Sequence, residues 1–502
     1  MGSHTQEVET RQGRVLGTRG EHQASFLGIP YARPPVGLLR FAAPQPPEPW
    51  PGVRDCTRFA ASCPQPEHHP VAGFAASGAR DEDCLFLNVY TPAADAARRP
   101  VMVWVHGGGF VFGSGSEPLY DGAALTTRGD VVVVSVHYRL GALGFLQLGL
   151  HGGDELGATD NAGLRDQVAA LRWVRENIGA FGGDADNVTL FGESAGAACI
   201  TAVMVMPAAE GLFRRVVSQS GTANRLGNAD SGEKATGRVL THLGLGRDDL
   251  ARLWELPVAS LVDAQEATGA RCLPVWGVES MPQRPLEYVR AGRAAGVELL
   301  IGTNRDEAKL LVAPNRPAID DATLRKQVAT MLPRRASERV GDVIDAYRRS
   351  RAAHDLPGDN LSLLDAIQGD GQFRTGARKL AVAQREHQPR TFLYLFTWES
   401  PARRGTLGAC HALDIPFVFG ATDQPLQRRF AGAGPAATAL SHRMMDAWIA
   451  FARSGDPAHA DLGEWPAYDN ARQVTMVFGE RSGAVAAPLG EEAAIWDDVL
   501  SA

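Results

Sequence analysis

The chain has 502 residues, of which 44% are hydrophobic and 21% are charged, and its formal net charge is −7. This composition is typical of a globular protein with a large core, and it predicts no basic surface for binding nucleic acid. The longest apolar runs, such as 131–136, are far shorter than the roughly 20 residues of a membrane-spanning helix, so we expect a soluble protein without a membrane partner.

The N-terminal stretch MGSHTQEVETRQGRVLG has no apolar segment of the kind found in secretion signals. Six cysteines are too few for a disulfide scaffold in a chain of this length. Both a cytoplasmic location and the mature form of a secreted protein therefore stay open.

Short β-branched runs alternate with helical patterns along the chain. Apolar strands that alternate with helices predict an α/β protein with a mostly parallel sheet covered on both faces. We expect one domain over 1–502, with a helical subdomain at about 317–386 inserted before a histidine-bearing loop. The predicted strands are 101–106, 131–138, 187–192, 214–221, 297–303 and 391–397, and the clearest predicted helix is 164–181.

The sequence GESAG at 192–196 joins the predicted strand NVTLF to the helix-forming stretch AGAACITAVMV. A Gly-x-Ser-x-Gly turn between a strand and a helix is typical of a nucleophile elbow, which holds the serine hydroxyl at a helix N-terminus. A chance match to so short a pattern is the alternative interpretation. Ser194 is the candidate nucleophile.

A serine hydroxyl is a weak nucleophile, so it needs a base, an orienting acid and donors for the oxyanion. The sequence HGGGF at 106–110 follows the predicted strand 101–106, where this architecture places its second source of backbone donors. We assign the oxyanion hole to the N–H groups of Gly108, Gly109 and Ala195. A merely flexible glycine turn is the alternative.

Several longer motifs in one order give the chain a family resemblance. They are FLGIPYARPPVGLLRF, EDCLFLNVYTP, VMVWVHGGGF, YRLGALGF, FGESAG, GTNRDE and HALDIPFVFG. The chain resembles the type-B carboxylesterases, the group that includes the cholinesterases, over nearly its whole length. The resemblance implies the α/β-hydrolase fold and hydrolysis of carboxylic esters through an acyl-enzyme, with no metal and no cofactor.

In this fold the acid and then the histidine follow the nucleophile along the chain. Asp306 and Glu307 both come after the predicted strand 297–303, and spacing alone does not separate them. The resemblance implies Glu307, which leaves Asp306 as a solvated or loop-bracing carboxylate. Five histidines follow, and the resemblance selects His411 as the base; the others are His354, His387, His442 and His459.

The resemblance also implies supporting groups. Glu193 matches an acidic residue beside the nucleophile, although the N-terminus of a helix favours a carboxylate in any case. Ser220 and Asp414 match groups near the base. His106 and His137 are interpreted as structural.

A disulfide between Cys63 and Cys84 is a further implication of the resemblance. Two free thiols in a reducing compartment are the alternative.

The substrate is expected to be a small-molecule ester. The loop between Cys63 and Cys84 has no tryptophan to stack on a choline cation, so choline esters are poor candidates. Phe110, Arg225 and Arg271 are the candidate substrate-binding residues, and the two arginines suggest an acyl group that carries a free carboxylate.

Two other functions remain as alternatives to an esterase. One is an amidase of the same fold, and the other is a catalytically idle adhesion or binding member of the family. The oligomeric state cannot be predicted from the sequence.

Overall fold

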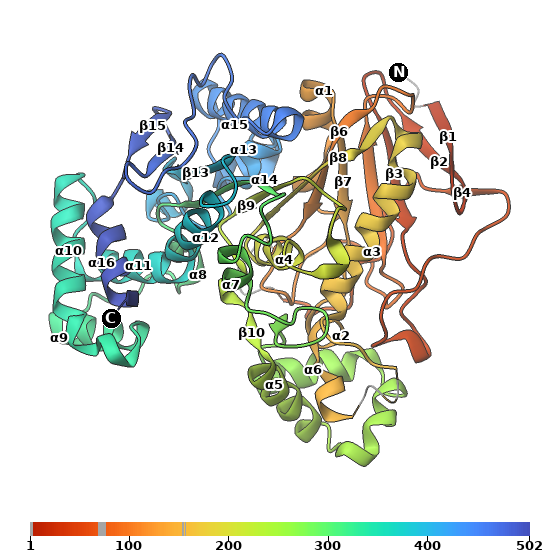
Figure 1. Cartoon of the computed structure of the whole chain (residues 1–502), viewed down its shortest axis with the longest axis horizontal. Helices are drawn as coiled ribbons and strands as arrows, with labels where there is room; N and C mark the ends of the chain where they lie inside the picture. The colour runs from red at the N-terminus through yellow and green to blue at the C-terminus, as the bar shows by residue number, and fades with distance from the viewer. Residues whose placement is uncertain (1–3, 69–76, 153–154, 156, 502) are drawn as a thin grey trace. The chain divides into compact units, whose positions relative to one another are not determined.

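The computed structural model describes residues 4–68, 77–152, 155 and 157–501 (Figure 1). The chain divides into two compact units: a first unit of residues 1–299 and 448–457, and a second unit of residues 300–447 and 458–502. The expectation of a single domain with an inserted helical subdomain stays a prediction.

The first unit is built on a sheet whose strands run in the order β1-β2-β3-β5-β7-β6-β8-β9, with β4 paired to β2. Strands β7, β6, β8 and β9 are parallel to one another. The pairs β1–β2, β2–β3 and β3–β5 are antiparallel, whereas β4 pairs with β2 in parallel. The bounds are β1 His4–Thr10, β2 Gly13–Arg19, β3 Ala24–Pro30, β4 Val53–Asp55, β5 Phe86–Thr91, β6 Arg99–Val105, β7 Val132–Val136, β8 Gly183–Glu193 and β9 Arg215–Gln219.

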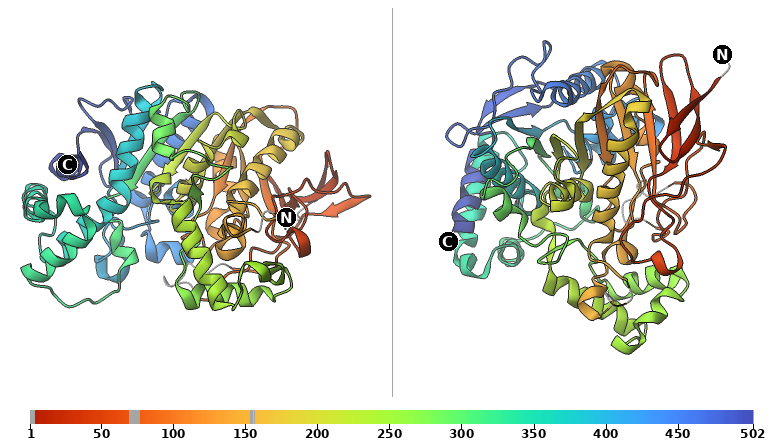
Figure 2. Two further views of the ribbon diagram at one scale, coloured as in Figure 1. Left: turned by 60° about the horizontal axis from the view of Figure 1, so that its bottom comes forward. Right: turned by 45° about the vertical axis from the view of Figure 1, so that its right-hand side comes forward.

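The parallel strands are buried on both faces, which explains their continuous apolar sequences. Every residue of β7 and β9 is buried, as expected where helices cover both faces of a parallel sheet. The four strands predicted in this half correspond to β6 to β9 with shifts of a few residues at their ends. Strands β1 to β5 were not predicted from the sequence. The hairpin β1–β2 forms the edge of the sheet and is coloured red in Figures 1 and 2.

Helices α3 and α4 of the first unit pack on β8 and on each other. The predicted helix 164–181 is observed as α3 followed by a 3₁₀ turn at Ile178–Phe181. Helices α5 and α6 pack together (Figure 1), and α6 also contacts α2. The bounds are α1 Ala123–Gly129, α2 Gly141–Phe145, α3 Ala162–Asn177, α4 Ala195–Val203, α5 Ala229–His242, α6 Val258–Thr268 and α7 Pro285–Arg290.

The second unit contains most of β12 (Glu298–Asn304), together with β13 (Thr391–Phe396), β14 (Val474–Phe478) and β15 (Gly483–Ala486). Strands β13 and β14 are parallel, and β14 and β15 are antiparallel. Both strands predicted in this half, 297–303 and 391–397, are found as β12 and β13.

The helix-prone segment 317–386 contains α9 to α12, and helices α9, α10, α11 and α16 share an apolar core. The helices of this half are α8 Ala308–Leu311, α9 Asp321–Met331, α10 Val340–Ala353, α11 Asn360–Gly369, a π-helical turn Asp370–Arg374, α12 Thr375–Arg385, α13 Ile415–Val418, α14 Pro425–Phe430, α15 Pro435–Ser454 and α16 Gly490–Ser501. None of the helices in the described part of the chain is both long and apolar enough to span a membrane.

Candidate active site

Ser194 stands at a sharp turn between β8 and α4, as the sequence predicts. Its backbone has φ 54° and ψ −120°, a region that residues with a side chain rarely occupy. Two hydrogen bonds hold the turn: Ser194 N–H donates to the Gln219 carbonyl at 2.9 Å, and Ala198 N–H donates to the Ser194 carbonyl at 2.9 Å. The strained conformation is thus fixed by β9 on one side and by α4 on the other.

The two glycines of the pentapeptide are required by close backbone contacts. A Cβ atom on Gly196 would lie 2.1 Å from the Val105 carbonyl oxygen, and one on Gly192 would lie 2.7 Å from the same atom. Both distances are shorter than a carbon and an oxygen tolerate, so neither position accepts a side chain. The end of β6 therefore presses directly against the serine turn.

The glycine loop after β6 lies against the same turn. A Cβ on Gly107 would lie 2.8 Å from Glu193 Oε2 and 3.1 Å from Ser194 Cβ. Gly108 and Gly109 have positive φ angles of 108° and 64°. Within the described part of the chain, no acceptor for the N–H groups of these two glycines is found. The loop thus brings two backbone donors without acceptors to the segment beside Ser194.

Phe110, a candidate substrate-binding residue, is buried. Its ring packs edge to face on Phe145 with centroids 5.9 Å apart, and its carbonyl accepts from Gly141 N–H at 2.7 Å. These contacts fix the far end of the glycine loop. Contact of Phe110 with a substrate stays a prediction.

Glu193 and Ser220 are both buried in the first unit. The carboxylate of Glu193 faces the Gly107 backbone, as the close approach described above indicates. Ser220 follows β9 with φ 52°, one residue beyond the carbonyl of Gln219 that accepts from Ser194. Their roles as supporting groups stay predictions.

Glu307 and His411 form a buried pair in the second unit. His411 Nδ1 lies 2.6 Å from Glu307 Oε2, and only 5% of the histidine surface and 1% of the glutamate surface are exposed. The other carboxylate oxygen, Oε1, accepts from Asn304 N–H at 2.8 Å. Glu307 immediately precedes α8, a few residues beyond the end of β12. Both oxygens of the carboxylate thus have a donor facing them.

Two residues that the sequence did not single out also fix the histidine. The side-chain amide of Asn304 donates to the Cys410 carbonyl at 2.7 Å, next to His411 in the chain. The ring of Phe373, in the π-helical turn, packs on the His411 ring with centroids 4.7 Å apart. Asn304 belongs to the quoted motif GTNRDE, whereas no sequence signal marks Phe373.

Asp306, adjacent to Glu307, braces the histidine loop from a different side. It accepts from Ala409 N–H at 3.0 Å and pairs with Arg305 at 2.8 Å and Lys309 at 3.3 Å. Burial raises the pKa of Asp306, but the charges of Arg305 and Lys309 outweigh that effect and hold its pKa below the ordinary value. Of the two neighbouring carboxylates, Glu307 is therefore the one bonded to His411.

Asp414 supports the same loop. It is fully buried, and its carboxylate accepts from the Tyr394 hydroxyl at 3.0 Å and from the Asn304 amide at 3.4 Å. The carboxylate thus links β13 and the end of β12 to the turn that begins α13. Its contribution to catalysis stays a prediction.

His106 and His137 are buried structural groups of the first unit. His137 Nε2 lies 2.8 Å from Ser116 Oγ and its Nδ1 lies 3.1 Å from the Ala61 carbonyl, while His106 stacks on Tyr138 with centroids 4.6 Å apart. Burial lowers the pKa of His106 to about 3 and that of His137 to about 4. Both rings are therefore neutral over the physiological pH range.

Because the pKa values of His106 and His137 are lowered, we expect acid to destabilise the fold. The pKa values of both histidines in the folded state lie below the unfolded value of about 6.5, so the unfolded chain takes up protons first as the pH falls. The stability that the neutral rings contribute is therefore complete above about pH 6.5 and is lost as the pH falls towards 4. We expect the free energy of unfolding to fall by about 2–3 kcal/mol between pH 7.5 and 5.5. Urea unfolding at both values measures the difference, and His137→Asn should remove about half of it. An unchanged difference in that variant would contradict the assignment.

Arg225 and Arg271 lie on the wall of one pocket in the first unit. The pocket has a volume of about 550 Å³ and is lined by residues of the segments 223–238, 271–276 and 284. The two arginines, 46 residues apart in the sequence, are brought together by the pairing of β10 (Gly227–Asn228) with β11 (Val275–Trp276). The two arginines thus line the same pocket, and their contact with a substrate stays a prediction.

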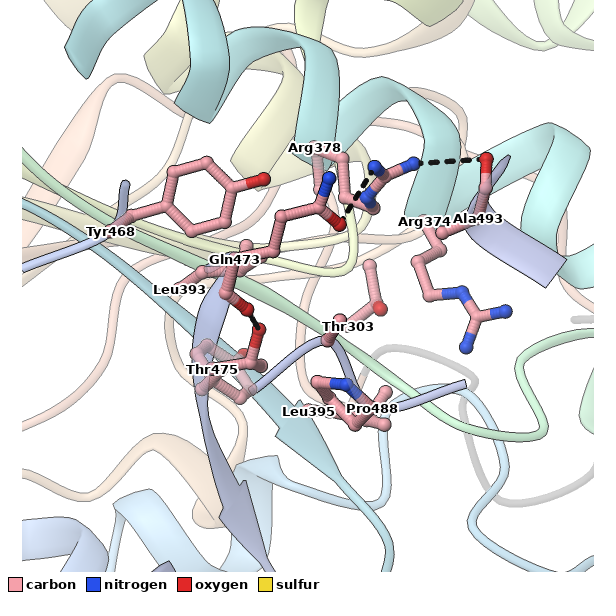
Figure 3. Close-up of a pocket in the computed structure, with 13 residues that line it drawn as sticks. Thr303, Arg374, Arg378, Leu393, Leu395, Tyr468, Gln473, Thr475, Pro488 and Ala493 are labelled. Atoms are coloured by element: carbon pink, nitrogen blue, oxygen red, sulfur yellow. Dashed lines mark hydrogen bonds between the residues drawn. The ribbon is translucent and has the colours of Figure 1, made fainter. Parts of the chain in front are cut away.

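A second pocket, in the second unit, offers no comparable site (Figure 3). Its volume is about 30 Å³, which suits about one water molecule. Arg378 on its wall already donates to the Ala493 carbonyl and to Gln473 Oε1, both at 3.3 Å (Figure 3). No group of three or more histidine, cysteine or acidic residues in the described part of the chain is placed to hold a metal ion.

Cys63 and Cys84 are buried thiols in this structure, so the bridge implied by the resemblance is not formed here. A hydrogen bond to Cys63 and burial raise the pKa of the Cys84 thiol well above its ordinary value. Leu140 N–H also donates to Cys63 Sγ at 3.2 Å. The two thiols are therefore neighbours, and their oxidation to a bridge stays a prediction.

Comparison with known proteins places the chain among esterases. A family model described as the carboxylesterase family matches residues 4–496. The chain is 38% identical over 482 residues to para-nitrobenzyl esterase of Bacillus subtilis (strain 168), covering 94% of each protein. It is 35% identical to fumonisin B1 esterase of Sphingopyxis macrogoltabida, covering 95% of this chain and 86% of that protein. The solved structure of a thermophilic PNB esterase matches with a TM-score of 0.87 at 36% identity, covering 98% of this chain and 99% of that chain.

Proposed function

The chain belongs to the carboxylesterase family, has the α/β-hydrolase fold and is a carboxylic ester hydrolase, and we propose that Ser194, His411 and Glu307 are its nucleophile, base and acid. The observation that carries the proposal is the buried pair of His411 Nδ1 and Glu307 Oε2 at 2.6 Å. A carboxylate on Nδ1 keeps the proton there and makes Nε2 the nitrogen that accepts a proton. The strained turn at Ser194 supports the nucleophile.

The proposed reaction has two halves that share one base. Ser194 Oγ attacks the ester carbonyl carbon while His411 Nε2 takes the hydroxyl proton, and the carbonyl oxygen becomes an oxyanion. The N–H groups of Gly108, Gly109 and Ala195 donate to that oxyanion. The intermediate then expels the alcohol, which receives the proton from His411, and an acyl-enzyme remains. Water then attacks the acyl carbonyl carbon while His411 takes its proton, and the second intermediate expels Ser194 Oγ, which receives that proton from His411 as the acid is released.

The proposal is tested by asking whether a Ser194→Ala variant still forms an acyl-enzyme. Mass spectrometry of the intact protein after a brief reaction with an ester reports the mass of the acyl group directly. The same measurement on Ser454→Ala, at the exposed end of α15, gives a matched control.

The preferred acyl group is proposed to carry a free carboxylate. The support is that Arg225 and Arg271 line one pocket, since a guanidinium pairs with a carboxylate through two charge-assisted hydrogen bonds. The segment with Arg225 begins at Gly221, where a Cβ would lie 2.1 Å from the Ser194 carbonyl oxygen. The arginine thus follows closely on the residue that touches the serine turn.

We expect kcat/KM for a succinate half-ester to exceed that for the matching butyrate ester by about tenfold, because a hydrogen bond to a charged group contributes about 1.5–3 kcal/mol. Arg225→Ala and Arg271→Ala should each reduce this ratio several-fold. Arg247→Ala removes an exposed charge outside the pocket and should leave the ratio unchanged. If butyrate is the better substrate and neither pocket variant changes the ratio, the preference is wrong.

A further inference from the structure

The pocket that holds Arg225 and Arg271 is strongly cationic. Besides the two arginines, Lys234, Arg238 and Arg284 line it, and no aspartate or glutamate does. We call these five residues and the space they enclose the cationic pocket. Such a concentration of positive charge is unexpected in a chain whose formal net charge is −7.

The walls of the cationic pocket are well ordered by hydrogen bonds. Asn161, buried at the start of α3, accepts from Val275 N–H and donates to the Val275 carbonyl, both at 2.8 Å. Asn228 caps α5 by accepting from Ser231 N–H at 3.0 Å. Gly227 N–H donates to the Pro274 carbonyl at 3.0 Å. Four of the five cations therefore project from two connected segments whose positions are fixed, and Arg284 comes from the start of α7.

Four of the cations in the cationic pocket, Lys234, Arg238, Arg271 and Arg284, are poorly compensated by acidic side chains of the described residues. Lys234, Arg238 and Arg271 form no ion pair with any described residue, and Arg284 reaches Glu287 only at 4.0 Å. Lys234 and Arg238 are four residues apart on α5, a spacing at which like charges repel each other and destabilise a helix. Asp230 and Glu233 also lie on α5 but outside the lining. A bound anion would reduce the electrostatic repulsion between the cationic side chains that line the pocket.

The remaining walls favour an organic anion. Leu226, Leu273, Val275 and Trp276 supply an apolar surface, which an inorganic anion cannot use. The N-terminal end of α5 adds a positive electrostatic potential. A carbon skeleton with several carboxylates would use both the charges and the apolar surface.

We propose that the cationic pocket binds an organic polycarboxylate, with two or more free carboxylates on one skeleton, both as a free acid and as the acid part of an ester. One carboxylate pairs with Arg225 and Arg271, and the others pair with Lys234 and Arg238 on α5. The second half of the proposal rests on the proposed function, because it makes the pocket part of the acyl site. Binding of the free acid does not depend on catalysis.

The pocket is connected to the serine turn within the first unit. Ala223 on its wall donates its N–H to Thr201 Oγ1, on α4, at 2.8 Å. Helix α4 begins at Ala195, directly after Ser194. An acid bound along segment 223–226 therefore lies on a wall that is hydrogen-bonded to the helix carrying the nucleophile.

Isothermal titration calorimetry at constant ionic strength tests the proposal with four probes: citrate, succinate, butyrate and inorganic phosphate. We expect citrate to bind the full-length protein at least about tenfold more tightly than butyrate, with succinate between them, because each additional carboxylate gains a charge-assisted pair. Phosphate should bind more weakly than citrate. The double variant Lys234→Gln/Arg238→Gln should weaken citrate binding at least about fivefold and butyrate binding less.

Arg247→Gln is the matched control, since it removes an exposed cation that is not part of the pocket, and it should leave the affinity for citrate unchanged. Equal affinities for citrate and butyrate would overturn the proposal. So would an unchanged citrate affinity in the double variant, and phosphate binding as tight as citrate would overturn the organic ligand class. Citrate binding that persists in Ser194→Ala supports the pocket independently, so a failure of the proposed nucleophile and a failure of the pocket give different results.

Discussion

Ser194→Ala is expected to lower kcat for ester hydrolysis by at least about four orders of magnitude, because the acyl-enzyme route disappears with the hydroxyl. Alanine retains the Cβ atom, and the two backbone hydrogen bonds that hold the turn, to the Gln219 carbonyl and from Ala198 N–H, do not involve the hydroxyl. We therefore expect an unchanged fold. Initial rates with p-nitrophenyl butyrate and a thermal unfolding curve measure the two quantities.

The melting temperature of the Ser194→Ala variant separates a role of the serine in the reaction from a role in the fold. Ser194 has a positive φ of 54°, which costs an alanine about as much as a serine. Hence a large loss of activity with the melting temperature unchanged would place the serine in the chemistry. Retention of more than a few per cent of the activity would contradict the assignment, and so would an equal loss in the Ser454→Ala control.

The elbow and the parallel strands could be predicted because their signals are local. β-Branched runs such as β7 are buried on both faces, and the elbow needs glycine wherever the end of β6 approaches it. Strands β1 and β2 were missed because they mix exposed polar and buried apolar residues in short segments, a pattern that a loop can also show. Their pairing is fixed by neighbouring strands rather than by their own sequence.

Long-range contacts limited the prediction of the site. Asp306 and Glu307 are adjacent in the sequence, and only the fold shows that one bonds Ala409 while the other bonds His411. Phe373 packs on His411 although the two residues are 38 positions apart in the sequence, and no sequence pattern indicates this contact. Lys234 and Arg238 on α5 and Arg284 before α7 were missed for the same reason, since nothing in their own segments marks them as neighbours of Arg225 and Arg271.

Glu307 and Asp306 are adjacent but have different partners, so the losses of kcat and of stability in variants of the two residues can be compared directly. Glu307→Gln is expected to lower kcat by about three to four orders of magnitude, because an amide facing Nδ1 favours the wrong tautomer of His411. Asp306→Asn leaves Arg305 and Lys309 beside an uncharged group in a buried position, so it should lower the free energy of unfolding by about 3 kcal/mol. Its effect on kcat should be at least about tenfold smaller than that of Glu307→Gln. Kinetics with p-nitrophenyl butyrate and urea unfolding of both variants provide the comparison.

His411→Ala completes the comparison, because residues that act as one catalytic unit give losses that do not add. We expect its loss in kcat to match that of Ser194→Ala, and the double variant Ser194→Ala/His411→Ala to lose no more than either single variant. A base that acts on a different nucleophile would give a double variant whose loss is the product of the two. If Asp306→Asn abolished turnover while Glu307→Gln did not, the acid would be Asp306, and the 2.6 Å pair of Glu307 and His411 would be structural.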